Sequence, residues 1–146
     1  VSNEIPKQFH RLFSDLISNF RNESYNAVCY DCRTIIEIGL KMKLEEVNEL
    51  HIRHHNRNRE NKIDQLIEKC WKLHLIDNKG RDMAHYIRKL ANKLLHEGYG
   101  IGAEFVSNNK NNSQENTLIL IRNTFYIVEY LFGKPDKRTR LHSVKT

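Results

Sequence analysis

The stretch RDMAHYIRKLANKLLH, residues 81–96, decides the fold. Met83, Ile87, Leu90 and Leu94 recur at intervals of four, three and four residues. This spacing predicts an amphipathic α-helix, because it places the four side chains on one side. Such a helix must bury its apolar side against other elements, and the rest of the sequence supplies four more helical segments.

Composition and periodicity favour helices throughout the chain. Two Pro and six Gly in 146 residues suit long helices better than a turn-rich β fold. No segment has the clear alternation of a strand. We therefore predict an all-α fold, an antiparallel bundle of four to five helices. The predicted helices span residues 6–21, 24–44, 62–75, 81–96 and 117–132, with loops or turns at 45–61, 77–80, 98–102 and 107–116.

The last predicted helix, residues 117–132, is apolar nearly all round. We expect it either at the centre of the bundle or half-buried in a partner. Residues 1–132 are predicted to form one helical domain, and residues 133–146 a basic flexible tail or linker. The tail carries +4 of the chain's net charge of +6. The chain begins with Val rather than Met, so we expect a processed chain or a piece of a longer protein.

Cysteine usage and hydropathy indicate the compartment. Cys29, Cys32 and Cys70 are an odd number of cysteines, and each lies in an apolar helical pattern. We expect reduced thiols that serve as small core residues. The apolar runs are too short to span a bilayer, and no signal peptide opens the chain. The sequence thus predicts a cytoplasmic protein without a membrane partner.

Arg88, Asn92 and His96 are the principal candidate site. Their spacing of four and four residues keeps the three side chains within about 80° on one side of the helix. A guanidinium, a carboxamide and an imidazole in one row can bind a phosphate and move a proton. The alternative is an ordinary solvated helix side, although Asn is a poor helix-interior residue unless it has a partner.

Further polar residues extend this candidate site. Arg33 and Glu37 lie one helical turn apart, so they either form an intrahelical ion pair or reach across to the helix 81–96. His51, His54 and His55 lack a Cys or carboxylate at convincing ligand spacing. We therefore expect no metal or other cofactor, and we favour a basic loop that touches phosphates. The candidate nucleic-acid contacts are Arg81, Lys89, Arg53 and Arg57, with His85 as a supporting residue.

Two short motifs and their order give a family resemblance. Residues 27–37 read A-x-x-x-x-x-R-x-x-x-E, and residues 87–96 read I-R-x-x-x-N-x-x-x-H. An all-apolar closing helix follows. In this order the chain resembles the HEPN superfamily of helical domains over about residues 8–132, and most closely a branch often attached to restriction endonuclease subunits.

The resemblance implies a bundle that commonly forms a homodimer, with the Arg and His facing a cleft between two chains. In active members this site cleaves RNA without a metal ion. The resemblance therefore also implies a role in antiviral defence. Carried over, His96 would be the general acid or base, Arg88 the phosphate clamp and Asn92 the orienting residue. Seven residues separate Arg88 from His96, a longer interval than is usual in active members.

Two functions therefore remain open. The first is a candidate metal-independent endoribonuclease or RNA-binding domain that uses the helix 81–96. The second is a non-catalytic dimerisation or regulatory module, which would associate through the helix 117–132 and be fused to, or associated with, a separate effector.

Overall fold

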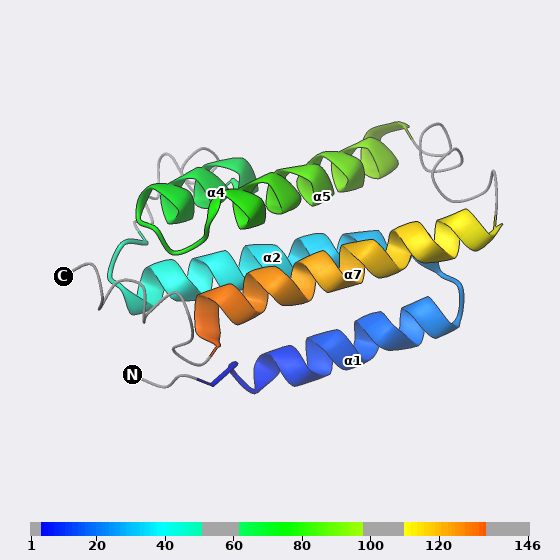
Figure 1. Ribbon diagram of the computed structural model, residues 1–146, viewed down its shortest axis with the longest axis horizontal. Helices are drawn as coiled ribbons and strands as arrows, with labels where there is room; N and C mark the ends of the chain where they lie inside the picture. The colour runs from blue at the N-terminus through cyan, green and yellow to red at the C-terminus, as the bar shows by residue number, and fades with distance from the viewer. Residues whose placement is uncertain (1–3, 51–61, 98–109, 134–146) are drawn as a thin grey trace.

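Five helices make up the part of the chain that the computed structural model describes, residues 4–50, 62–97 and 110–133 (Figure 1). No strand occurs within these ranges, so the prediction of an all-α fold is confirmed. None of the described helices is both long and apolar enough to cross a membrane. The helices are α1 (Gln8–Arg21), α2 (Tyr25–Glu46), α4 (Ile63–Lys72), α5 (Asn78–Glu97) and α7 (Lys110–Phe132).

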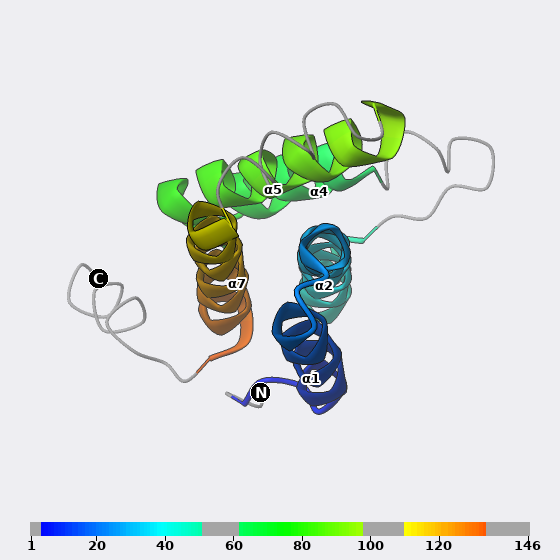
Figure 2. The same ribbon diagram turned by 90° about the vertical axis from the view of Figure 1, so that its right-hand side faces the viewer.

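The helices form three layers. In the middle layer, α2 and α7 run in the same direction, with α1 on one side and α4 and α5 on the other (Figures 1 and 2). Both α1 and α5 run antiparallel to this central pair. All four of the other helices contact α2. The arrangement therefore depends on α2, and it presents α4 and α5 together as one outer layer.

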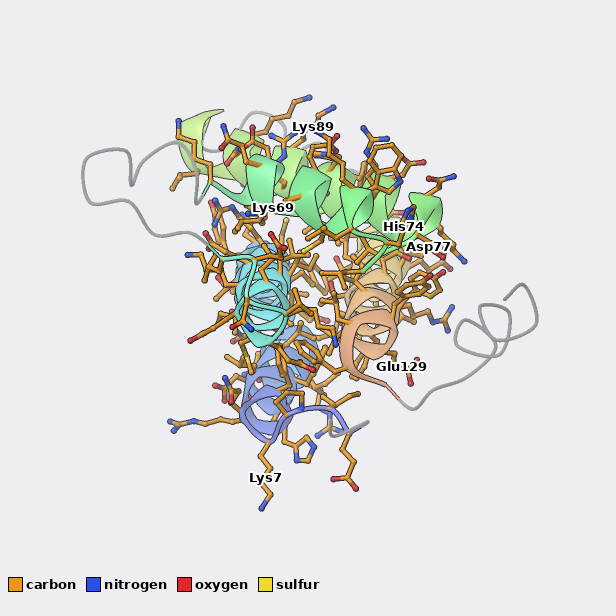
Figure 3. The ribbon with its side chains drawn as sticks, turned by 90° about the vertical axis from the view of Figure 1, so that its left-hand side faces the viewer. Lys7, Lys69, His74, Asp77, Lys89 and Glu129 are labelled. Carbon is orange, nitrogen blue, oxygen red and sulfur yellow. The ribbon has the colours of Figure 1, made fainter. Side chains whose placement is uncertain are left out.

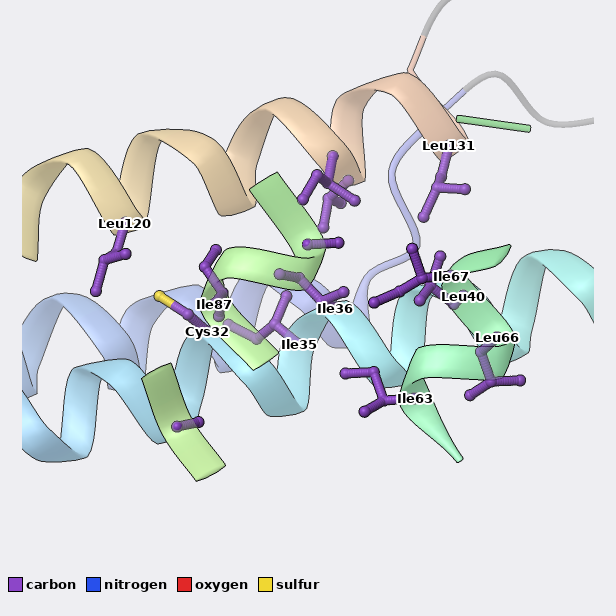
Figure 4. Close-up of a cluster of buried hydrophobic side chains, with 14 of the residues drawn as sticks. Cys32, Ile35, Ile36, Leu40, Ile63, Leu66, Ile67, Ile87, Leu120 and Leu131 are labelled. Carbon is purple, nitrogen blue, oxygen red and sulfur yellow. The ribbon is translucent and has the colours of Figure 1, made fainter. Parts of the chain in front are cut away.

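The core lies between the central pair and the two outer layers. From α2, Ile36 and Leu40 are fully buried, and Ile87 of α5 and Leu131 of α7 belong to the same buried cluster (Figure 4). Burial of each such side chain stabilises the fold by roughly 1.5–3 kcal/mol. The apolar side of α2 is therefore shared among all the layers, which explains why its buried positions extend along the whole helix.

All three cysteines are free and buried in this core. Burial raises the pKa of Cys29, Cys32 and Cys70 to about 12. At neutral pH the reactive thiolate is therefore scarce at each position. The prediction of reduced thiols that serve as core residues is confirmed.

The predicted turn at residues 77–80 is wrong, because α5 already begins at Asn78. One carboxylate oxygen of Asp77, Oδ1, accepts the backbone N–H of Gly80 at 2.7 Å. The other oxygen accepts the hydroxyl of Tyr126. Asp and Gly are typical of turns, but the same Asp oxygen can equally cap the first N–H groups of a helix. Asp77 thus caps α5 and also ties its start to α7.

The predicted loop at residues 107–116 is wrong for its second part, since α7 begins at Lys110. Ser113 and Thr117 are buried, and the Thr117 hydroxyl donates to the Ser113 carbonyl at 2.6 Å. Burial against the bundle thus outweighs the weak helix propensity of an Asn-rich sequence. Most apolar residues of α7 face the bundle. Of the two positions expected for this helix, α7 therefore has the central one. The predicted segments at 51–61, 98–102 and 133–146 lie outside the described residues, except for Gly133.

We expect Asp77→Ala to destabilise the domain by about 2 kcal/mol, because it removes a helix cap and the partner of the Tyr126 hydroxyl. Asp77→Asn should cost less, since an amide oxygen can still accept the Gly80 N–H. Urea unfolding followed by circular dichroism measures both changes. Asp15→Ala, at an exposed position on α1, is the matched control. Equal stability of Asp77→Ala and the wild type would contradict the capping role.

Candidate functional site

The predicted site residues follow the outer polar side of α5. Arg81, His85, Arg88 and Asn92 are all partly buried along this side, whereas Lys89 is exposed. The opposite side of α5 carries the buried apolar positions that pack on the bundle. The helix register that forms the core therefore also fixes where these polar side chains emerge.

Glu68 of α4 organises the first half of this side. Its Oε1 accepts from Arg81 Nη2 at 2.6 Å, and its Oε2 accepts from Arg81 Nε at 2.7 Å. The same Oε2 lies 2.8 Å from His85 Nε2. The Arg81 guanidinium also stacks on the Trp71 ring, 3.8 Å from the ring centroid. The charge of Arg81 is thus neutralised in the free protein, and its nucleic-acid contact stays a prediction.

These bonds change the acidity of the Glu68 carboxyl. Hydrogen bonds from Arg81, and next from His85, lower the pKa of Glu68 from 4.5 to about 2. Both donors stabilise the charged carboxylate. Glu68 is therefore ionised at neutral pH, and it places a fixed negative charge next to α5.

Sequence reasoning missed Glu68 and Trp71. Glu68 lies 13 residues from Arg81 and 17 from His85, so no local spacing connects them. Only the antiparallel packing of α4 on α5 brings the carboxylate to both partners. Nothing in the sequence indicated that Glu68 pairs with Arg81 and His85, because a Glu on the polar side of an amphipathic helix is common.

Arg88 has a different kind of partner from Arg81. Its Nε and Nη2 lie 3.3 and 3.2 Å from Nδ1 of His85. In the described part of the chain it has no carboxylate partner within ion-pair distance. The side chain is therefore held in place by an imidazole, while no carboxylate of the described residues balances its positive charge.

Asn92 and His96 follow Arg88 along the same helix. Asn92 is partly exposed and has no hydrogen-bond partner among the residues that the structure describes. The backbone of His96 belongs to α5, but its side chain lies outside the described residues. The structure thus brings Arg88 and Asn92 to one side of α5, and the role of His96 stays a prediction.

Arg33 and Glu37 form an intrahelical ion pair on α2, with 3.5 Å between Nη1 and Oε2. Lys41 Nζ lies 3.6 Å from the other oxygen of Glu37. Of the two alternatives that the sequence left open, the structure has the intrahelical pair. No bond from Arg33 or Glu37 to α5 occurs among the described residues.

Positive charge gathers on the α4 and α5 layer. Residues 62–95 hold eight Lys or Arg against four Asp or Glu, a net of +4, whereas α2 holds three against four. Figure 3 shows Lys69 and Lys89 on this layer and Lys7 at the far side of the molecule. Among the helices that the structure describes, this layer would therefore attract an anionic polymer most.

Other candidate features give no competing site. A cavity of about 470 Å³ opens along α1, lined by residues that include Phe13, Ile17 and Arg21, far from α5. Within the described ranges no group of three His, Cys, Asp or Glu could hold a metal ion. The predicted contacts Arg53 and Arg57, and the cluster His51, His54 and His55, lie outside those ranges.

Comparisons with protein-family models, curated proteins and solved structures find no match to this chain. Its function therefore has to be argued from the chemistry of the site. On that chemistry, the guanidinium of Arg88, which has no carboxylate partner among the described residues, is the most informative feature of α5.

We expect Glu68 to make stability depend on pH in the acid range. Its pKa is about 2 in the folded chain and 4.5 ordinarily, so the unfolded chain binds more protons in between. The stabilisation by ionised Glu68 is complete above about pH 4.5 and is lost as the pH falls towards 2. Wild type should therefore lose stability more steeply than Glu68→Gln over this window.

Urea unfolding at a series of pH values measures this difference. Glu45→Gln, at an exposed carboxyl of α2, is the control and should follow the wild type. Parallel curves for wild type and Glu68→Gln would show that the bonds to Arg81 and His85 are not made in solution.

Proposed function

We propose that the chain is an HEPN-like domain that binds RNA through the outer side of α5, and that it is a candidate metal-independent endoribonuclease. The observation that carries the proposal is the state of Arg88. Its guanidinium is fixed by His85 and is not neutralised by any carboxylate of the described residues. A partly buried cation of this kind gains most from an anionic ligand.

A phosphodiester is the ligand that suits this side best. The planar fork of a guanidinium can pair with two phosphate oxygens at once. Asn92, one turn later, offers a carboxamide without another described partner. The net charge of the α4 and α5 layer would attract the rest of the backbone. An open helix side suits a long polymer, which does not need an enclosed pocket.

The proposed cleavage is a transesterification within the RNA. The 2′-oxygen attacks the adjacent phosphorus, and the bond from phosphorus to the next 5′-oxygen breaks, leaving a cyclic phosphate. A base removes the 2′ proton and an acid protonates the 5′-oxygen, so the reaction consumes no metal or redox partner. We assign the proton transfers to His96 and stabilisation of the charged phosphate to Arg88. A homodimer would supply two imidazoles to one site.

The second candidate function is a non-catalytic dimerisation or regulatory module attached to an effector. Exposed apolar side chains support it, since Leu95 is 67% exposed and Ile119 is 50% exposed. However, most of the apolar residues of α7 already pack inside the bundle, which leaves few for association through that helix. We therefore give RNA binding precedence.

Arg88→Ala should weaken binding of a short fluorescein-labelled single-stranded RNA about tenfold, because one charge-assisted contact is lost. The slope of log affinity against log salt should also fall by about 0.7, the value of one phosphate contact. Fluorescence anisotropy measures both quantities. Arg11→Ala is the matched control, as Arg11 is exposed on α1 at the other side of the bundle. Equal effects of the two variants would remove α5 as the binding side.

Cleavage of mixed cellular RNA in EDTA tests the catalytic part separately. We expect the wild-type domain to cut RNA, and both His96→Ala and Arg88→Ala to lose that activity while remaining folded. RNA binding by His96→Ala should persist, since binding is assigned mainly to Arg88. Binding without cleavage by the wild type would contradict the enzyme and leave an RNA-binding module.

A further inference from the structure

An imidazole separates a carboxylate from a guanidinium on the outer side of α5. Glu68 Oε2 lies 2.8 Å from Nε2 of His85, and both Nε and Nη2 of Arg88 lie within 3.3 Å of its Nδ1. The three groups come from two helices, with Glu68 on α4 and the others on α5. Both ring nitrogens of His85 are therefore engaged.

The partners determine which nitrogen of His85 carries the hydrogen. A guanidinium can only donate, so Nδ1 has to be the acceptor in its contact with Arg88. Nε2 then bears the hydrogen and donates it to Glu68, which is ionised. A carboxylate that fixes a tautomer in this way also fixes the ring orientation. Glu68 thus prepares His85 as an acceptor.

The geometry points to Glu68 and His85 as positioning residues that hold Arg88 ready for an RNA phosphate. This inference rests on the proposed function and adds two residues to it. Neither is a catalytic residue, because both nitrogens of His85 are already bonded and Glu68 lies behind the ring. Their effect on RNA passes through Arg88.

The contact with His85 also selects the part of Arg88 that meets the ligand. Nε and one hydrogen of Nη2 share the edge that faces His85. The end of the guanidinium, with Nη1 and the second hydrogen of Nη2, has no partner among the described residues and can bind a ligand. Two non-bridging oxygens of one phosphodiester fit that end as a bidentate pair. Holding the side chain in advance reduces the ordering that binding would otherwise require.

Two amide variants, each of which reproduces one ring nitrogen of His85, separate the roles of the two nitrogens. Asn carries its amide oxygen on Cγ, where Nδ1 is attached, so His85→Asn can still accept from Arg88. Gln carries its amide one carbon further out, so His85→Gln can donate to Glu68 but offers little to Arg88. The affinity for fluorescein-labelled single-stranded RNA should fall about five- to tenfold in His85→Gln and less than about threefold in His85→Asn.

A double-mutant cycle shows whether His85 acts through Arg88. In the Arg88→Ala background, His85→Gln should change RNA affinity little further. A purely structural role would instead add its effect in both backgrounds. The ring tautomer is read independently from long-range ¹H–¹⁵N correlation spectra of the free wild-type protein, which should show hydrogen on Nε2 and none on Nδ1. Urea unfolding of every variant verifies that it is folded.

The outcomes distinguish this inference from the proposed function. If Arg88→Ala weakens RNA binding but the Asn and Gln variants behave alike, positioning through Nδ1 is overturned and RNA binding on α5 stands. A hydrogen on Nδ1 would likewise overturn the positioning role alone. If Arg88→Ala leaves RNA binding unchanged, both proposals fail.

Discussion

The packing of α2 against α7 is the constraint on which the rest of the structure depends. Where Gly39 faces α7, an added Cβ would lie 3.3 Å from Leu131 Cδ1 and 3.6 Å from Phe9 Cζ. A larger residue at position 39 would therefore require Leu131 to shift, because the first, second and last described helices pack closely at this level. With this pair in place, α5 can lie across both helices and bury its apolar side, and its polar side is left facing outward.

The short helix α4 gives that outward side its chemical character. Without α4, Arg81, His85 and Arg88 would be three similar cationic or polar groups on one helix. Glu68 pairs with Arg81 and orients His85, whereas no carboxylate of the described residues pairs with Arg88. Arg81 thus has a structural role, whereas Arg88 is the residue of this row that can bind a ligand. This difference, rather than the amount of positive charge, is the main support for a phosphate-binding function.

The helices were predictable from the sequence because their apolar periodicity is strong, and most of their ends lie within a few residues of expectation. The larger errors have physical causes. One carboxylate oxygen of Asp77 accepts a backbone N–H, which occurs both in turns and at helix caps. The polar start of α7 is helical because Ser113 and Thr117 are buried against helices that are distant in the sequence. Within the candidate site, spacing predicted that Arg88 and Asn92 share a side. It could not predict Glu68, since that contact depends on how α4 packs on α5.

The order of the helices also has a consequence for the making of the protein. The central partner of α2 is α7, the last helix of the bundle, so the two halves of the core are far apart in the sequence. A growing chain on the ribosome can pack α1, α4 and α5 on α2, yet the side of α2 that packs on α7 stays uncovered until residue 132 has emerged. The domain must therefore complete its fold late, and an interrupted chain would present apolar surface to chaperones and proteases.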